Sequence, residues 1–134
     1  MSKQDVLNRL KSEKVIALIR ADSSASLLDC ARALAAGGLT CIELTMTTPN
    51  AIECCAQVAK ELPNVLLGTV LDAETAKRGI AAGAKFIVTP AVRPEVIKAC
   101  KEAGVPILSG ALTRTEACNA WDAGADVIKI FPAE

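Results

Sequence analysis

A lysine lies within an apolar segment near the end of the sequence. Lys129 stands between Ile128 and Ile130 in residues 126–134, Asp-Val-Ile-Lys-Ile-Phe-Pro-Ala-Glu, and this β-branched run predicts a buried strand. Lysine is seldom buried without a partner, and burial favours the neutral amine that attacks a carbonyl carbon. Lys129 is therefore a candidate Schiff-base nucleophile. The alternative is a lysine of an edge strand whose ammonium group reaches water.

A glutamate occupies a similar place in an earlier apolar segment. Because side chains alternate along a strand, Ile42 and Leu44 are expected on one face and Glu43 on the other. A glutamate that moves protons beside a reactive lysine suits imine and enamine chemistry on a ketone. A structural ion pair between Glu43 and Lys129 is the alternative.

Composition narrows the remaining classes of function. The 134 residues suffice for one domain, 1–134, and 15 basic residues balance 15 acidic ones, so we expect no nucleic-acid or membrane partner. The sequence contains no histidine, which excludes Ser-His-Asp triads and the usual zinc sites, and we expect neither a metal nor a cofactor. The polar N-terminus lacks the pattern of a signal peptide, so a cytoplasmic protein is expected, with its six cysteines reduced and packed as small core residues.

The elements that position these residues repeat along the chain. Short apolar runs recur about 20 to 25 residues apart, and each interval holds one helix-like stretch that ends near an Ala-Gly pair or at Leu62-Pro63-Asn64. The expected strands are Val15–Arg20, Thr40–Thr45, Val65–Val70, Phe86–Pro90, Pro106–Gly110 and Val127–Phe131. The expected helices are Ser26–Ala36, Asn50–Glu61, Ala73–Ala82, Pro94–Ala103 and Arg114–Ala123.

This alternation predicts an α/β fold with a parallel sheet and right-handed crossovers. A (β/α)8 TIM-type barrel needs two more units than the six present, whereas an open six-stranded parallel sheet accepts six. The spacing by itself slightly favours the open sheet. No Gly-rich nucleotide loop follows an early strand, and such a loop often accompanies the doubly wound form of that sheet.

Polar residues gather where the expected strands end, which is the side that carries the site in both architectures. They are Arg20, Glu43, Thr45, Thr69, Thr89, Pro90, Ser109 and Lys129. The hydroxyl groups among them are able to donate hydrogen bonds to a carboxylate or keto oxygen, although such residues are common at strand ends. We therefore expect a small ligand here, and the keto acid as its identity follows only from the resemblance described next.

Four motifs carry a family resemblance: Cys41-Ile-Glu-Leu-Thr, Leu67-Gly-Thr-Val-Leu71, Phe86-Ile-Val-Thr-Pro90 and Lys129-Ile-Phe-Pro-Ala-Glu134. From about Val15 to the last residue, the chain resembles the 2-keto-3-deoxy-6-phosphogluconate (KDPG) and 4-hydroxy-2-oxoglutarate (KHG) aldolases. The resemblance implies a TIM-barrel class I aldolase, usually a homotrimer of carbohydrate metabolism, that cleaves a 2-keto-4-hydroxy acid into pyruvate and an aldehyde.

The resemblance also implies roles for particular residues. Lys129 would form the Schiff base, Glu43 would be the general acid and base, and Thr69 and Pro90 would line the pyruvate pocket. Thr89 and Phe131, which lie in the same motifs, are further candidates for substrate contact. Where the bacterial enzymes typically carry an arginine for the substrate carboxylate, this chain has Thr47, and Arg20 is a candidate to supply the charge.

The sequence ends after the sixth strand, whereas the resembled family continues through two further βα units that carry a phosphate loop. On this basis we expect an incomplete barrel with two unpaired edges and exposed apolar surface facing the helices, in a chain that is unstable or self-associating. It would be a gene-model fragment or a truncated product, with a natural short isoform as the alternative, and a phosphorylated aldehyde would bind it poorly. Two alternative functions are a catalytically impaired, non-catalytic binding or assembly subunit, and a dehydratase-type lyase that uses the same lysine.

Overall fold

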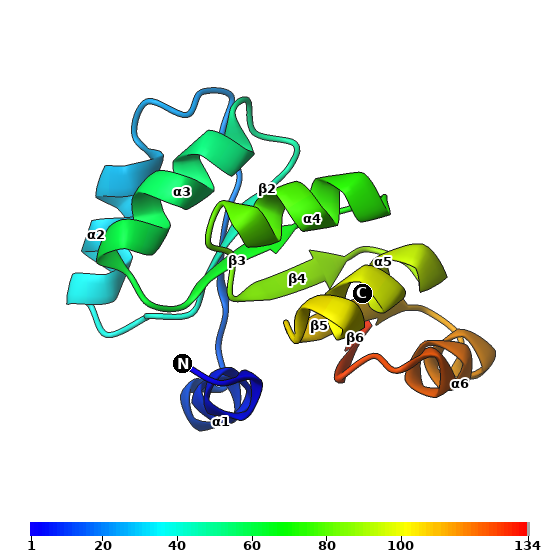
Figure 1. Cartoon of the computed structure of the whole chain (residues 1–134). Coiled ribbons are helices and arrows are strands. Elements are labelled where there is room, and N and C mark those ends of the chain that lie inside the picture. The colour runs from blue at the N-terminus through cyan, green and yellow to red at the C-terminus, as the bar shows by residue number, and fades with distance from the viewer. Residues whose placement is uncertain (134) are drawn as a thin grey trace.

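The computed structural model describes residues 1–133 and consists of six strands that alternate with helices (Figure 1). The strands are β1 (Ala17–Ile19), β2 (Ile42–Thr45), β3 (Val65–Gly68), β4 (Phe86–Thr89), β5 (Ile107–Ala111) and β6 (Val127–Ile130). The helices are α1 (Lys3–Glu13), α2 (Leu27–Ala36), α3 (Ala51–Glu61), α4 (Ala73–Ala81), α5 (Pro94–Ala103) and α6 (Arg114–Ala123). All six predicted strands and five predicted helices are confirmed, and α1 is an additional helix that the repeat did not predict.

All neighbouring strands are parallel, and they follow one another in chain order from β1 to β6. A doubly wound sheet reverses its strand order at a switch point, so this sequential order is that of a barrel instead. The sheet curls into a half-barrel (Figure 1). The barrel interpretation is therefore confirmed, and a doubly wound sheet is excluded.

The helices α2 to α6 cover the outer face of this half-barrel. The larger hydrophobic core lies between them and the sheet, where Ile42, Leu44 and Leu67 are completely buried. A smaller cluster around Leu66 and Phe86 lies on the inner face, and α1 packs against it through Val6. Neighbouring residues in a strand thus belong to different cores, as the period of two predicts.

Glycines end several of the helices as the Ala-Gly pairs predicted. Gly104 and Gly124 adopt left-handed backbone conformations, with φ of 67° and 102°, just after α5 and α6. The first Ala-Gly pair differs, because Gly37 is right-handed and the left-handed residue is Gly38. Left-handed backbone costs little for glycine, so these positions let the chain turn from each helix back to the next strand.

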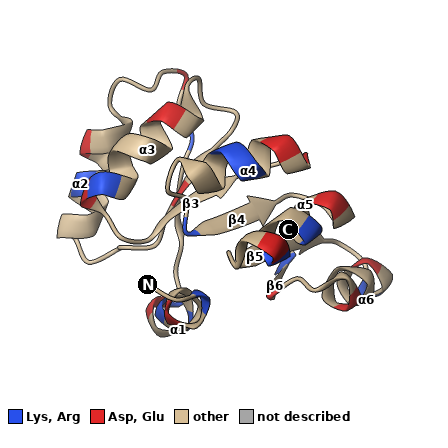
Figure 2. Cartoon of the chain, viewed as in Figure 1, with Lys and Arg blue, Asp and Glu red and all other residues tan. Residues whose placement is uncertain are grey.

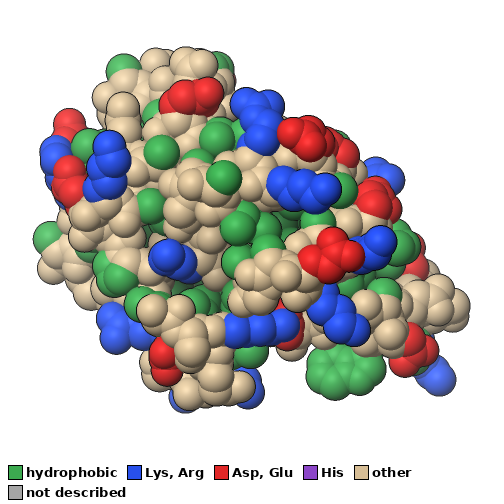
Figure 3. All heavy atoms as spheres, in the orientation of Figure 1, with side chains coloured by type: hydrophobic (Ala, Val, Ile, Leu, Met, Phe, Trp, Pro, Cys, Tyr) green, Lys and Arg blue, Asp and Glu red, His purple; other side chains and the backbone are tan. Residues whose placement is uncertain are grey.

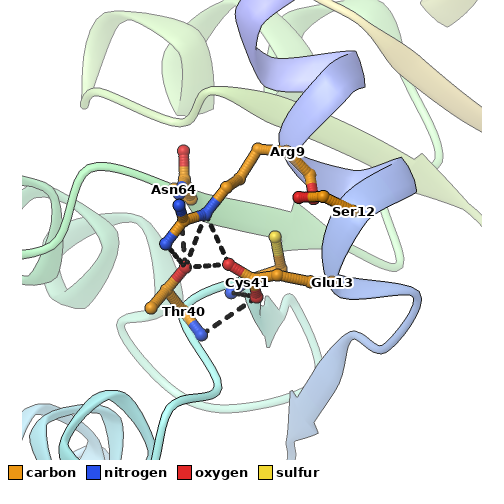
Figure 4. A network of polar contacts seen from close by, with 6 residues as sticks. All are labelled: Arg9, Ser12, Glu13, Thr40, Cys41 and Asn64. Carbon is orange, nitrogen blue, oxygen red and sulfur yellow. Dashed lines mark hydrogen bonds and ion pairs between the residues drawn. The ribbon is translucent and has the colours of Figure 1, made fainter.

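A polar network joins the end of α1 to the start of β2 (Figure 4). The carboxylate of Glu13 accepts hydrogen bonds from the backbone N–H groups of Thr40 and Cys41, at 3.1 and 3.0 Å, and from the side chains of Thr40 and Arg9. Asn64 donates to the Thr40 hydroxyl at 3.4 Å. These contacts hold α1 beneath the inner face of the half-barrel and anchor the strand that carries Glu43.

Charged and apolar surfaces are distributed differently. Acidic and basic residues lie mainly on the helices, and the face in Figure 3 shows both signs side by side (Figures 2 and 3). Large apolar side chains are exposed near the two edge strands, where Leu18 is 47% and Ile130 is 57% exposed. Leu18 lies on the inner face by alternation with Ile19, so the exposed surface is not confined to the helix-facing side that we expected.

Two further findings concern the cysteines and the helices. Four cysteines are buried as predicted, but Cys30 and Cys118 are exposed, so the expectation that all six are core residues was wrong. Both lie on helices, where a position next to a buried one can face solvent. Across residues 1–133, each helix is too short or too polar to span a bilayer.

Candidate active site

Glu43 lies in the middle of β2 on the inner face of the half-barrel. It is only 4% exposed, while its neighbours Ile42 and Leu44 belong to the helix-facing core. Burial raises the pKa of the Glu43 carboxyl above its usual range, and the positive charges of Lys129 and Arg20 partly offset this effect. A carboxyl group whose pKa is moved toward neutrality can both take up and release a proton, which suits a general acid and base.

Lys129 lies on β6, across the half-barrel from Glu43. Its register partner is Gly110 on β5, and its side chain is partly buried. The ammonium nitrogen stands over the ring of Phe131, 4.9 Å from the ring centre, where a cation–π interaction is favourable. The ion pairs found within residues 1–133 lie elsewhere, and none joins Lys129 to Glu43. This geometry gives no support to a purely structural ion pair.

Arg20 follows β1 and is exposed, but its backbone is held on both sides. The hydroxyl of Thr45 donates to the carbonyl of Ile19 at 3.4 Å, and the hydroxyl of Thr48 accepts from the N–H of Ala21 at 3.1 Å. The contacts from the segment after β2 thus bracket Arg20. Sequence reasoning missed Thr48, whose signal was only its place in a run of hydroxyl-bearing residues.

Thr47 occupies the position at which the resembled enzymes carry an arginine. Its side chain is exposed, and its hydroxyl lies 2.8 Å from the hydroxyl of Thr45, which is completely buried. Thr47 therefore lies in the segment after β2 whose neighbouring residues hold the backbone on both sides of Arg20. A neutral hydroxyl at this position leaves Arg20 as the nearby positive charge from β1.

Thr69 directly follows β3 in an unusual backbone conformation. Its φ is 58°, in the left-handed region that a β-branched residue rarely adopts. Such strain persists only where the surroundings impose it, and it is concentrated at functional sites. Thr69 is partly buried at the carboxyl end of the sheet, where the motif predicted it.

The structure separates Thr89 and Ser109 from Glu43. Thr89 lies on the same face of its strand as Ile87, and Ser109 on the same face as Ile107, and both isoleucines belong to the helix-facing core. The Thr89 hydroxyl accepts a 3.4 Å hydrogen bond from the N–H of Gly110, and the Ser109 hydroxyl has no partner within residues 1–133. A period of two places these residues on the outer face, so the expectation that their hydroxyls face the ligand is not met.

Pro90 and Phe131 remain at the open end of the half-barrel. Pro90 follows β4 and packs against β5 so closely that a Cβ atom on Gly110 would lie 2.2 Å from the Pro90 carbonyl carbon. Phe131 is 45% exposed beside Lys129. A hollow of about 500 Å³ lies beside β1 and is lined in part by Arg20. Another hollow of about 340 Å³ lies between α1 and the amino ends of β1, β5 and β6. Neither Glu43 nor Lys129 lines these two hollows.

The inner face of the half-barrel thus carries a buried glutamate and a lysine, and the charge of Arg20 reaches the glutamate from the end of β1. Residues 1–133 contain no group of three or more side chains suited to holding a metal ion. An amine and a proton carrier are the two groups that imine chemistry on a carbonyl compound requires. Glu134, the last residue of the lysine motif, lies outside the described residues.

Comparison with known proteins identifies the family. The model of the KDPG and KHG aldolase family matches residues 6–134. The 2-dehydro-3-deoxy-phosphogluconate aldolase of Treponema pallidum is 41% identical over 132 residues, a match that covers 97% of this chain and 61% of that protein. The chain therefore belongs to the KDPG and KHG aldolase family, and it spans less than two thirds of the length of this relative.

Solved structures agree with the fold. The 2-keto-3-deoxy-6-phosphogluconate aldolase of Zymomonas mobilis ZM4, solved with 3-phosphoglycerate, has a TM-score of 0.87 and 30% identity, over 98% of this chain and 64% of that one. The KDPG aldolase of Legionella pneumophila, solved with pyruvate captured as a covalent carbinolamine intermediate, has a TM-score of 0.81 and 29% identity, over 88% of this chain and 58% of that one.

Proposed function

We propose that this protein is a class I aldolase that cleaves a 2-keto-4-hydroxy acid into pyruvate and an aldehyde. The substrates would be 2-dehydro-3-deoxy-6-phosphogluconate, 4-hydroxy-2-oxoglutarate or both, with glyceraldehyde 3-phosphate or glyoxylate as the second product. The observation that carries the proposal is the placement of Glu43 and Lys129 on the inner face of one half-barrel, close enough for their charges to interact. The carbinolamine of pyruvate reported for the Legionella relative is the intermediate that such a lysine forms.

The first half of the reaction forms the imine. The neutral Lys129 amine attacks the C2 keto carbon, and the keto oxygen takes up a proton to give a carbinolamine. Glu43 then donates a proton to the departing hydroxyl group, water leaves, and a protonated imine remains. The raised pKa of the Glu43 carboxyl favours its protonated form, so the group is suited to this donation.

The second half breaks the carbon–carbon bond. Glu43, now a carboxylate, accepts the proton of the C4 hydroxyl directly or through a water molecule, the C3–C4 electron pair moves toward the protonated imine, and the aldehyde leaves. The resulting enamine is protonated at C3, and water hydrolyses the imine to release pyruvate and the free amine. The chemistry needs no electron acceptor, because the imine nitrogen holds the electron pair between the two steps.

The remaining residues would hold the substrate. The Arg20 guanidinium is the candidate partner of the substrate carboxylate, since Thr47 offers only a hydroxyl group there. Thr69 and Pro90 would line the pocket around the three pyruvate carbons, with Phe131 beside the amine. Thr89 would contribute through the backbone of β5, to which it is hydrogen-bonded, instead of touching the substrate.

The assembly and its location belong to the same proposal. We expect a homotrimer, which the family resemblance implies, acting in carbohydrate metabolism in the cytoplasm. The cysteines within residues 1–133 are free thiols, and a reducing compartment keeps them so. Light scattering coupled to gel filtration measures the assembly, and a monomer or dimer at working concentration contradicts the trimer.

A second candidate function is a non-catalytic assembly subunit. It is favoured by the apolar side chains exposed near β1 and β6, where Leu18, Ile130 and Phe131 are each more than two fifths exposed. Exposed apolar surface beside an unpaired strand edge is suited to binding another protein chain. This function predicts co-purification with a complete homologue and no covalent adduct with pyruvate.

The deciding experiment traps the imine. The protein is incubated with pyruvate and borohydride, and its intact mass and peptide map are measured, while circular dichroism of the same sample reports folding. One reduced pyruvate on Lys129 is expected, with none on Lys129→Ala and an unchanged adduct on Lys85→Ala, an exposed lysine on the loop before β4. A folded protein without an adduct refutes the aldolase and favours the assembly subunit.

Turnover distinguishes the aldolase from the remaining alternative. A class I aldolase releases pyruvate and an aldehyde in equal amounts from either 2-keto-4-hydroxy acid. A dehydratase-type lyase that uses the same imine yields no aldehyde. Formation of the Lys129 adduct without aldehyde release therefore assigns the lysine correctly but contradicts the proposed reaction.

A further inference from the structure

Gly68, the last residue of β3, lies directly beneath the carboxylate of Glu43. A Cβ atom built on Gly68 would lie 1.9 Å from the Glu43 Oε1 atom, 2.5 Å from its Cδ atom and 2.8 Å from its Cγ atom. All three distances are well inside van der Waals contact. Even an alanine at position 68 would therefore occupy the space that the outer half of the Glu43 side chain now fills.

The backbone does not require glycine at this position. The glycines with positive φ in the described chain are those at positions 38, 83, 104 and 124, and Gly68 is not among them. It lies in regular parallel pairing opposite Thr45. Since most residues can adopt such a conformation, the reason for a glycine here is the absent side chain and not the backbone angle.

The Glu43 carboxylate depends on this space because no hydrogen bond within residues 1–133 fixes it. Its pKa reflects burial and the charges of Lys129 on β6 and Arg20 on β1, and no hydrogen-bond donor within residues 1–133 contributes. Leu66, two residues before Gly68 on the same strand, is apolar and buried on the same inner face. The position of the carboxylate is thus set by shape and by the charges of Lys129 and Arg20.

We propose that Gly68 is a positioning residue: the space left by its absent side chain holds the Glu43 carboxylate and thereby sets the distance of that carboxylate from the Lys129 imine. The proposal rests on the proton-transfer role proposed above for Glu43. Gly68 has no side chain that could contact the substrate or the Lys129 amine, so it acts only through Glu43. A larger residue at position 68 displaces the carboxylate while leaving the amine in place.

The geometric part of the proposal is tested by a double-mutant cycle on stability. Gly68→Ala is expected to lower the unfolding midpoint in urea, and the loss is expected to disappear in the Glu43→Ala background, where the Cγ, Cδ and Oε1 atoms are absent. Gly79→Ala is the matched control, because its Cβ atom would lie 2.4 Å from Leu67 Cδ2 on the helix-facing side. Its cost is expected to be the same in both backgrounds. Equal costs of Gly68→Ala in the two backgrounds overturn the proposal.

The electrostatic part is tested by carboxyl titration. Nuclear magnetic resonance of protein labelled at the glutamate side-chain carbon follows Glu43, which is assigned by its disappearance in Glu43→Gln. Gly68→Ala is expected to lower the pKa of the Glu43 carboxyl toward its usual range, because displacement from this space exposes it to water. An unchanged titration in the variant overturns the proposal. Neither of these two measurements needs an active enzyme, so they stand even if the aldolase assignment fails.

The catalytic part separates binding from proton transfer. In Gly68→Ala, borohydride is expected to trap pyruvate on Lys129 to the same final extent, while kcat for cleavage falls by roughly a hundredfold, the lower range for loss of a positioned acid or base. KM is expected to change by less than about threefold, because the variant leaves the proposed substrate contacts intact. If the wild-type protein forms no adduct, the aldolase proposal fails instead. A wild-type kcat in Gly68→Ala overturns the positioning role.

Discussion

Glu13→Gln is expected to weaken the attachment of α1 to the half-barrel by an amount that depends on pH. The wild-type carboxylate accepts hydrogen bonds from two backbone N–H groups at the start of β2 and from the side chains of Thr40 and Arg9. Burial alone would raise the pKa of Glu13, but these hydrogen bonds outweigh it and lower the pKa from 4.5 to about 2. The neutral glutamine retains one acceptor oxygen and adds a competing donor.

The size of the effect follows from the pKa. A depression from 4.5 to about 2 corresponds to about 3 kcal/mol of stabilisation of the folded state at neutral pH. Solvent screening near the surface reduces this to about 1–2 kcal/mol, since the Glu13 side chain is still 13% exposed. Because the folded-state pKa is the lower one, the stabilisation is present above pH 4.5 and is lost as the pH falls toward 2.

The assay is urea unfolding of wild type and Glu13→Gln at several pH values, followed by circular dichroism. The variant is expected to be less stable by about 1–2 kcal/mol at pH 7, and the two proteins are expected to converge near pH 2. Glu53→Gln, on the exposed side of α3, serves as the control and is expected to change stability by less than about 0.5 kcal/mol. A constant difference between wild type and Glu13→Gln from pH 7 to pH 2 refutes the reasoning.

Three further predictions concern the strand ends and the cysteines. Gly110→Ala is expected to lower the free energy of unfolding by more than about 2 kcal/mol, because its Cβ atom would collide with the Pro90 backbone, which cannot rotate away as a side chain can. Calorimetry measures this loss of stability, and a small change contradicts the close packing. Thr69→Asn is expected to raise stability by up to about 1 kcal/mol, because asparagine tolerates the left-handed backbone conformation at this position better than threonine does. The same variant is expected to lower turnover. A loss of stability together with full turnover contradicts this prediction. Iodoacetamide is expected to modify Cys30 and Cys118 rapidly, because only these two thiols of the described residues are exposed. The other four thiols are buried, and burial raises the pKa of Cys41, Cys55 and Cys100 to about 12, so they are expected to react slowly. Rapid modification of a third thiol, seen by mass spectrometry, contradicts the burial.

Local pattern predicted most of the fold because each βα unit carries its own signals. The alternation of apolar residues in β2 and β6 correctly placed Glu43 and Lys129 on the face opposite Ile42 and Ile128. Capping residues likewise predicted where helices begin. Thr113 and Glu116 form a capping box at the start of α6, and both the predicted and the observed helix begin at Arg114.

What the pattern missed depends on contacts between distant residues. The role of α1 was not predicted, because its attachment relies on Glu13 reaching Thr40, and no local signal joins two residues so far apart in the chain. Thr89 was expected at the ligand because it ends a strand and precedes Pro90. Its face is decided by the period of two, which places it on the same side of β4 as Ile87 in the helix-facing core.

The position of the proposed acid and base is decided at both ends of β2. Glu13 fixes the backbone where the strand begins, and the hydroxyl groups of Thr45 and Thr48 tie the segment after it to β1. Between these anchors all four residues of β2 are buried, so the backbone beneath Glu43 has little freedom. Within residues 1–133 the side chain itself has no hydrogen-bond anchor, and its carboxylate occupies the space above Gly68 that a Cβ atom would fill. A rigid strand that carries a carboxylate whose place is set by shape is suited to a group that must keep its position while it gains and loses a proton.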